Sequence, residues 1–326
     1  MLASVIIRTY NEQRYLPKLL QEIYNQVTEG LNYEIIIVDS GSTDATLEIA
    51  KAYNCKIVHI CKQDFSFGRS LNFGCRAASG DYLVFVSGHC VPSNSAWLQN
   101  LVKPLIEQKV VLTYGCQIGG NITKFSEHQL FNKFYPKVSS IPQDGFFCNN
   151  ANAALVRSVW ENYPFDEQLT GLEDMHLGKQ LINAGMKLGY VADSIVYHYH
   201  EEPWGKVCRR YEREAIALQH IMPEVHISFA DFLRYFIKAV LLDSGIALQQ
   251  RKFISKLPEI FMFRLMQFWG SYRGNHEHRK LSRQKKELYF YPKQNSTISL
   301  PKLVKKLSYV EPTATDCSTL TYESKQ

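Results

Sequence analysis

The first 90 residues alternate short β-branched runs with segments of helical periodicity. This alternation is typical of βαβ units, and therefore of a mainly parallel sheet with helices on both faces. The predicted strands are 4–8, 34–38, 56–60 and 81–86, and the predicted helices are 12–26, 45–53 and 68–78. We therefore predict an α/β fold with an open, Rossmann-like doubly wound sheet, whose ligands lie beyond the carboxyl ends of the strands.

A less regular pattern continues to about residue 225. It predicts helix 95–108, strand 110–114, a loop-rich stretch, strand 149–156, a helix from 171 to 185 and strand 187–191. We predict a catalytic domain over 1–225, a basic amphipathic helical extension over 226–295 and a flexible tail over 296–326.

Positive charge is concentrated in the extension, which holds 13 Lys and Arg against 5 Asp and Glu, while the whole chain has a net charge of +6. Within it, Phe229, Phe232 and Phe236 recur at helical spacing opposite Arg234. A nucleic-acid enzyme would carry its positive charge around the catalytic cleft, so we predict no nucleic-acid partner.

Two functions of the extension stay open. In the first, its apolar faces lie at a membrane surface while basic residues contact anionic head groups. The basic residues concerned are Arg279, Lys280, Arg283, Lys285 and Lys286. In the second, its helices pack on the catalytic domain or form a homodimer interface.

The sequence shows no secretory signal and no run of about 18 apolar residues. We therefore expect a cytoplasmic protein, either free or peripheral at the inner face of the membrane. Its eight cysteines are scattered singly, which favours reduced thiols over a disulfide framework or a structural zinc site.

Polar clusters follow three of the predicted strands. Thr9, Tyr10 and Glu12 follow the first strand, Asp39 ends the second and Ser87 follows the fourth. Because the carboxyl ends of parallel strands meet at one edge of the sheet, we predict that these residues bind a nucleotide. Each of them alone is also compatible with a turn or a helix cap.

Arg69 stands near the start of the predicted helix 68–78. A helix N-terminus and a guanidinium both favour an anion, so Arg69 is predicted to contact a pyrophosphate. An ordinary surface arginine is the alternative. No GxGxxG or GxxxxGKS sequence is present, which excludes a dinucleotide fingerprint and a P-loop.

Three histidines are candidate metal ligands. His89 follows the fourth strand, where a divalent cation that bridges phosphates would be a suitable partner. His198 and His200 alternate on a strand-like segment, so only one of them is expected to face the site. A hydrogen-bonded structural histidine is the alternative for each.

Adjacent acids open the helix predicted after residue 171. Glu173 and Asp174 point in different directions at a helix start, so that one can face an acceptor hydroxyl while the other orients it. The alternative is that two acids in a first turn only complement the helix dipole.

Taken in order, these motifs resemble family 2 glycosyltransferases of the GT-A fold. The resemblance covers about residues 1–200 and is closest to rhamnosyltransferase-like enzymes that build bacterial surface polysaccharides such as capsule or O-antigen. It rests on Ile6-Ile7-Arg8-Thr9-Tyr10-Asn11-Glu12, Val38-Asp39-Ser40-Gly41-Ser42-Thr43-Asp44, Gly80-Asp81-Tyr82-Leu83-Val84-Phe85 and Gly171-Leu172-Glu173-Asp174.

The resemblance implies an inverting transfer from a nucleotide-sugar, a UDP- or dTDP-sugar, to a hydroxyl of a glycan or lipid-linked acceptor. Asp174 would deprotonate that hydroxyl and Glu173 would place the acceptor. Asp39 would contact the nucleotide base, with Thr9, Tyr10 and Glu12 lining the same pocket. A divalent metal, Mn²⁺ or Mg²⁺, would neutralise the diphosphate leaving group.

The sequence departs from the family pattern at the metal. An Asp-x-Asp element usually follows the fourth strand, and here Ser87-Gly88-His89 stands in its place. Imidazole ligands from His89 and from His198 or His200 favour Mn²⁺ over Mg²⁺. A catalytically impaired nucleotide-sugar-binding scaffold of a polysaccharide assembly complex is the rival function, although the intact acid pair argues against it.

Overall fold

The computed structural model describes residues 1–277. The predicted tail over 296–326 lies outside the described residues. So do the basic residues predicted to meet a membrane, which are Arg279, Lys280, Arg283, Lys285 and Lys286.

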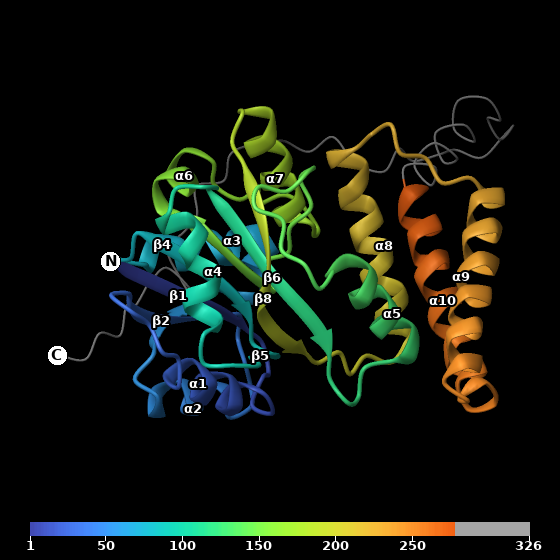
Figure 1. Ribbon diagram of the computed structural model, residues 1–326, viewed down its shortest axis with the longest axis horizontal. Helices are drawn as coiled ribbons and strands as arrows, with labels where there is room; N and C mark the ends of the chain where they lie inside the picture. The colour runs from blue at the N-terminus through green and yellow to red at the C-terminus, as the bar shows by residue number, and fades with distance from the viewer. Residues whose placement is uncertain (278–326) are drawn as a thin grey trace, which may run out of the picture.

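One mixed sheet of eight strands organises the described part of the chain, in the order β3-β2-β1-β4-β7-β6-β8-β5 (Figure 1). The strands are β1 (Leu2–Thr9), β2 (Asn32–Asp39), β3 (Lys56–His59), β4 (Tyr82–Ser87), β5 (Cys90–Pro92), β6 (Leu112–Gly119), β7 (Asn152–Val156) and β8 (Leu188–His198). The half formed by β3, β2, β1 and β4 is parallel, whereas β7 is antiparallel to both of its neighbours. The predicted doubly wound α/β fold is confirmed.

Helices cover both faces of the sheet because successive side chains of a buried strand point to opposite faces. In β1, Val5 and Ile7 pack in one core and Ile6 packs in the other. The first core lies under α1 (Leu16–Tyr24), α2 (Thr46–Ala52) and α4 (Trp97–Ile106). The second lies under α3 (Phe67–Ala77), α6 (Arg157–Asn162) and α7 (Glu173–Asn183).

Beyond the sheet, α10 lies between α8 and α9 and forms a helical layer with them (Figure 1). The helices of the layer are α8 (Trp204–Ile221), α9 (Phe229–Gln249) and α10 (Phe253–Asn275). Helix α5 (Phe125–Phe134) contacts both α10 and β6 and so joins the layer to the sheet. Gly270 and Gly274 of α10 face the backbone of α8 so closely that a Cβ would lie 2.3 Å from the carbonyl oxygen of Cys208 and 2.1 Å from that of Glu212. This contact fixes α8 against the layer.

Two elements differ from the sequence-based expectation. The stretch predicted to be loop-rich contains α5, which has no continuous apolar stripe because Phe125 and Phe131 are six residues apart. The last predicted strand, 187–191, runs on to His198 because its second half pairs with both β6 and β5.

None of the helices within residues 1–277 is both long enough and apolar enough to span a membrane.

Candidate active site

The predicted nucleotide-binding residues lie at neighbouring strand ends. The parallel register places Thr9 of β1 beside Asp39 of β2 and Arg8 beside Ser87 of β4. The carboxyl edge of the sheet therefore gathers segments that are up to 80 residues apart in the sequence, as a doubly wound fold requires.

Asp39 organises the turn that follows β2. Its carboxylate has no exposed surface and accepts hydrogen bonds from Thr9 Oγ1 (3.0 Å), Ser42 Oγ (2.5 Å) and the backbone N–H groups of Gly41 (3.0 Å) and Ser42 (2.9 Å). Both oxygens are thus fully used inside the turn. The predicted contact between Asp39 and a base would compete with these bonds.

Tyr10 and Glu12 lie on the loop after β1. Tyr10 is 44% exposed, and Lys62 Nζ donates a hydrogen bond to its hydroxyl at 2.9 Å and lies 5.0 Å from its ring centroid. Glu12 instead contacts His89, with 2.8 Å between Oε1 and Nδ1. The loop therefore offers an exposed aromatic face, and it also supports a candidate metal ligand.

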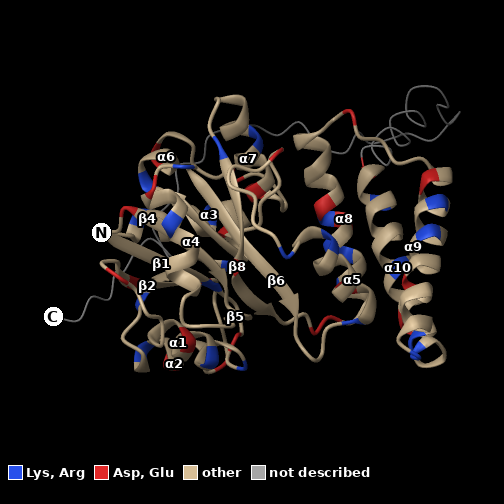
Figure 2. Ribbon diagram, viewed as in Figure 1, with Lys and Arg blue, Asp and Glu red and all other residues tan. Residues whose placement is uncertain are grey.

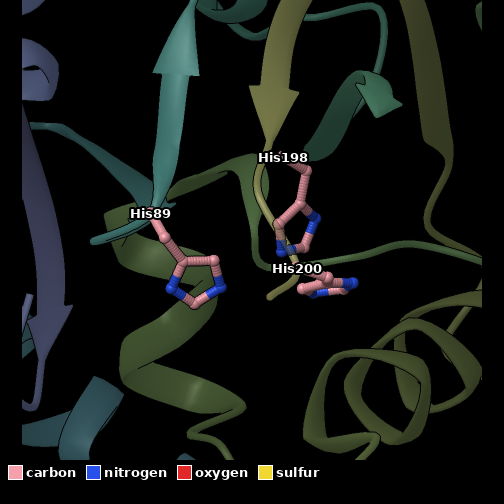
Figure 3. A group of neighbouring side chains, drawn as sticks. All are labelled: His89, His198 and His200. Carbon is pink, nitrogen blue, oxygen red and sulfur yellow. The ribbon is translucent and has the colours of Figure 1, made fainter. Parts of the chain in front are cut away.

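His89, His198 and His200 converge on one point, with one ligand atom from each ring within 4.8 Å of the other two (Figure 3). The expectation that only one of His198 and His200 faces the site is wrong. Strand β8 ends at His198, so His200 lies beyond the extended backbone and its side chain no longer alternates. The ring centroids of these two residues are 3.9 Å apart.

Each of the three rings has an oxygen acceptor at Nδ1. The partners are Glu12 for His89 (2.8 Å), Gln117 for His198 (2.7 Å) and Glu127 for His200 (2.7 Å). An acceptor at Nδ1 places the ring proton there and leaves the lone pair on Nε2. Three Nε2 lone pairs with outer hydrogen-bond partners form the usual arrangement of a histidine metal site.

The orientation of the Gln117 side-chain amide is fixed by the backbone N–H of Ala151, through Asn149. Its Nε2 donates to Asn149 Oδ1 at 3.0 Å, and the same oxygen accepts the N–H of Ala151 at 2.9 Å. Because a backbone N–H can only donate, the atom of Asn149 that faces it must be the amide oxygen. That oxygen accepts from the NH2 group of Gln117, so the Gln117 oxygen faces His198 and places the ring proton on Nδ1.

The protonation state of the buried histidines allows them to bind a cation. Burial, followed by the neighbouring His200 and His89, lowers the pKa of His198 well below its usual range. Burial, followed by Arg210 and His89, does the same to the pKa of His200. Both imidazoles are therefore neutral at pH 7, and the buried Nε2 of His198 has no hydrogen-bond partner in residues 1–277. A metal ion would satisfy that nitrogen.

Glu173 and Asp174 open α7, directly after Leu172 in a left-handed conformation (φ 56°). Asp174 accepts the N–H of Asn150 at 2.9 Å and that of Met175 at 2.7 Å. Burial, reinforced by the charge of Glu173, nevertheless raises the pKa of Asp174 to about 7. Glu173 pairs with Arg8 at 3.3 Å. The two acids therefore differ, since one forms an ion pair and the other titrates near neutral pH.

Arg69 is already paired within the protein. Its Nε donates to Glu167 at 2.9 Å and an Nη donates to the carbonyl oxygen of Asp64 at 3.0 Å. This pairing supports the alternative of a structural arginine, and the pyrophosphate contact stays a prediction.

Several residues of the site carry no recognisable motif. Gln117, Glu127 and Arg210 surround the histidines, and Arg210 donates to Glu127 at 2.6 Å. Arg8 lies in a strand motif, but the sequence does not show that it reaches Glu173 on a helix 165 residues away.

Residues 4–163 match the family model described as glycosyl transferase family 2. The chain is 29% identical over 224 residues to glycosyltransferase AglE of Haloferax volcanii, which is 64% of this chain and 70% of that protein. It is 27% identical over 223 residues to the O-antigen chain rhamnosyltransferase RfbN of Salmonella typhimurium, which is 65% of this chain and 70% of that one.

Among solved structures, the mannosyltransferase PcManGT from Pyrobaculum calidifontis, in complex with GDP-Man and Mn²⁺, shares the fold. The TM-score is 0.55 at 17% identity, and the match covers 89% of this chain and 87% of the other. The match thus extends past the sheet into the helical layer.

Proposed function

We propose, from the premise that this chain is a member of glycosyltransferase family 2 through residues 4–163, that it adds a sugar to a surface polysaccharide. The donor is a nucleotide-sugar, in our proposal a UDP- or dTDP-sugar, and the acceptor is a hydroxyl of a glycan or a lipid-linked glycan. The rival function, a catalytically impaired scaffold, is not favoured because the named relatives are glycosyltransferases.

One observation carries the proposal. The end of β1 and the loop after it contact both groups, because Arg8 of β1 pairs with the Glu173 carboxylate while Glu12, four residues on in the loop, contacts His89. These contacts support the proposal that the candidate metal cluster and the acid pair form one site at the carboxyl edge of the sheet.

In this proposal Asp174 is the general base. Its carboxylate accepts the proton of the acceptor hydroxyl as that oxygen bonds to the anomeric carbon and the bond from that carbon to the nucleotide diphosphate breaks. A base with a pKa of about 7 is ionised for part of the time near neutral pH and is basic enough to take the proton. Glu173, held by Arg8, would position the acceptor.

The residues present fit a divalent metal. His89, His198 and His200 would bind it through Nε2, each supported by an oxygen at Nδ1. The bound metal would supply charge neutralisation for the diphosphate. Three imidazoles favour Mn²⁺ over Mg²⁺, which prefers oxygen ligands.

The nucleoside would lie over the loops after β1 and β2. Tyr10 offers an exposed ring for stacking, while Thr9, Ser87 and Glu12 would border the nucleoside. Asp39 would act mainly by holding the turn through Gly41 and Ser42, and Arg69 through its contact with Glu167.

A donor screen tests the proposal. We expect one nucleotide-sugar among UDP-, dTDP- and GDP-sugars to raise the melting temperature in the presence of Mn²⁺. A ligand at 100 times its Kd stabilises a protein by about 2.7 kcal/mol. The measurement is a thermal-shift series with and without Mn²⁺, and the matching free sugar is the control. If no nucleotide-sugar shifts the melting temperature in either series, the proposed function is wrong.

The exposed face of the helical layer carries both apolar and basic side chains, and Figure 2 shows where Lys and Arg lie along α9. Its exposed apolar side chains include Phe229, Leu233, Ile237, Leu241 and Leu248 of α9 and Ile254 and Phe261 of α10. Exposed basic residues lie among them, including Arg234, Lys238, Arg251 and Lys252. We propose that this face contacts an anionic membrane surface.

Replacement of Ile237 and Leu241 by serine is expected to reduce flotation with vesicles that contain phosphatidylglycerol, because two exposed apolar anchors are lost. Flotation of the unmodified chain and of this variant, with and without anionic lipid, is the measurement. The control is Val27→Ser, which removes an exposed apolar side chain in the loop after α1. The alternative is a homodimer interface. It would be supported if light scattering shows that the unmodified chain is a dimer and the double variant is a monomer, while both float equally with the vesicles.

A further inference from the structure

Arg213 lies on α8 one turn after Arg210 and faces the acid pair rather than the histidines. Its guanidinium carbon lies 4.4 Å from the centroid of the Phe67 ring. A Cβ built on Gly171, two residues before Glu173, would lie 3.6 Å from the Nε of Arg213. The guanidinium is therefore held against the loop that carries the proposed base.

Arg213 differs from every other arginine of this site in having no anionic partner. Arg8 pairs with Glu173, Arg69 with Glu167, and Arg210 with Glu127 and Glu202. Within residues 1–277 the guanidinium of Arg213 forms no ion pair, and its buried Nε has no hydrogen-bond partner. Glu214, Glu173 and Glu202 are its acidic neighbours, and none of them bonds to it. A half-buried cation without a partner is costly unless a ligand supplies the anion.

Gly171 lets the side chain of Arg213 lie close to the start of α7. The Nε of Arg213 is the one heavy atom near an added Cβ at that position, whereas most glycines of the fold would bring a Cβ into close contact with several atoms. At 3.6 Å this is an ordinary van der Waals distance, so the Nε of Arg213 lies directly against the loop that precedes the acids.

We propose that Arg213 binds a phosphate group of a substrate beside the start of α7. A planar guanidinium that stacks on an aromatic ring has its N–H groups in the plane of the fork, which matches two phosphate oxygens. The phosphate belongs either to the donor diphosphate or to a lipid phosphate of the acceptor. The inference rests on the proposed function, which brings phosphate-bearing substrates to this edge of the sheet.

Two soluble probes distinguish the sources. Inorganic pyrophosphate with Mn²⁺ represents the donor, and farnesyl phosphate represents the acceptor, with farnesol as its uncharged counterpart. Calorimetric titration of Arg213→Gln is expected to show about tenfold weaker binding of one of these two phosphates, because a charge-assisted bidentate contact is lost. A selective loss for pyrophosphate identifies the donor, and a selective loss for farnesyl phosphate identifies the acceptor.

The matched control is Arg209→Gln, an exposed arginine on the same helix. Arg213→Lys keeps the charge but lacks the guanidinium fork, so its affinity for the phosphate should lie between that of Arg213→Gln and that of the unmodified protein. Melting temperatures verify that each variant is folded.

The inference is overturned if both phosphates bind folded Arg213→Gln within twofold of the unmodified protein, if Arg209→Gln loses as much affinity, or if the unmodified protein binds neither probe. Failure of the proposed function looks different, because the unmodified protein would then bind phosphate yet transfer no sugar from any donor.

Discussion

Asp174→Asn is expected to reduce sugar transfer by about 10³-fold, within the range that a general base contributes. The amide keeps the shape of the side chain, and its oxygen can still accept the N–H of Asn150, although its NH2 group cannot accept the N–H of Met175. It also cannot accept a proton from the acceptor. Initial rates of transfer, measured beside nucleotide affinity, separate the chemical step from binding. We expect the affinity to change less than twofold.

The pH profile of the unmodified enzyme should carry the signature of the same carboxyl. Burial and Glu173 raise the pKa of Asp174 to about 7, so transfer should increase as pH rises through 7 and the base loses its proton. The effect on stability has the opposite sign. A carboxyl whose pKa is raised by folding stabilises the folded state below its unfolded pKa of about 4, and this contribution is lost as pH rises through about 7.

At pH 8, therefore, Asp174→Asn should melt no lower than the unmodified protein although its transfer activity is lost. The matched control is Asp144→Asn, the same substitution at an exposed position of a nearby loop. It should leave both transfer and melting temperature unchanged. Transfer by Asp174→Asn within tenfold of the unmodified rate would assign the base to another residue.

The sequence predicts the fold well where local pattern and burial agree. The residues from Ala3 to Ile7 of β1 and from Ile35 to Asp39 of β2 are buried, so the apolar runs at Val5 and Ile36 identify strands that lie between two helical layers. Helix α5 is different, because its buried residues include Ser126 and Glu127, and its place depends on contacts with α10 that no local pattern contains.

The site is predictable in part for a related reason. Strand ends of a doubly wound sheet are gathered by topology, so the strand pattern alone is enough to place Thr9, Asp39 and Ser87 together. The convergence of His198 with His200 is not predictable by alternation, since it depends on where β8 ends. Arg213 lies on a helix with an ordinary charged pattern, and its lack of a partner becomes visible only in three dimensions.

Chelation is expected to abolish transfer, and Mn²⁺ is expected to restore it more fully than Mg²⁺ at equal concentration. The reason is the proposed ligand set, since three imidazole nitrogens suit Mn²⁺ better than Mg²⁺. The assay is turnover after EDTA and gel filtration, with each metal then added back. Unchanged turnover in chelator would remove the metal from the mechanism.

Electron paramagnetic resonance measures Mn²⁺ binding directly and therefore tests the same site without an activity assay. His198→Ala should lose the single Mn²⁺ expected per chain, because the buried Nε2 of His198 is one of the three proposed ligands. Gln117→Leu should retain the ligands yet weaken Mn²⁺ binding by about 10- to 100-fold, since the tautomer of His198 is no longer fixed. Gln117→Glu keeps an oxygen acceptor at Nδ1 and is the matched control. If Gln117→Leu and Gln117→Glu bind Mn²⁺ equally, the hydrogen bond to Nδ1 does not determine the metal affinity.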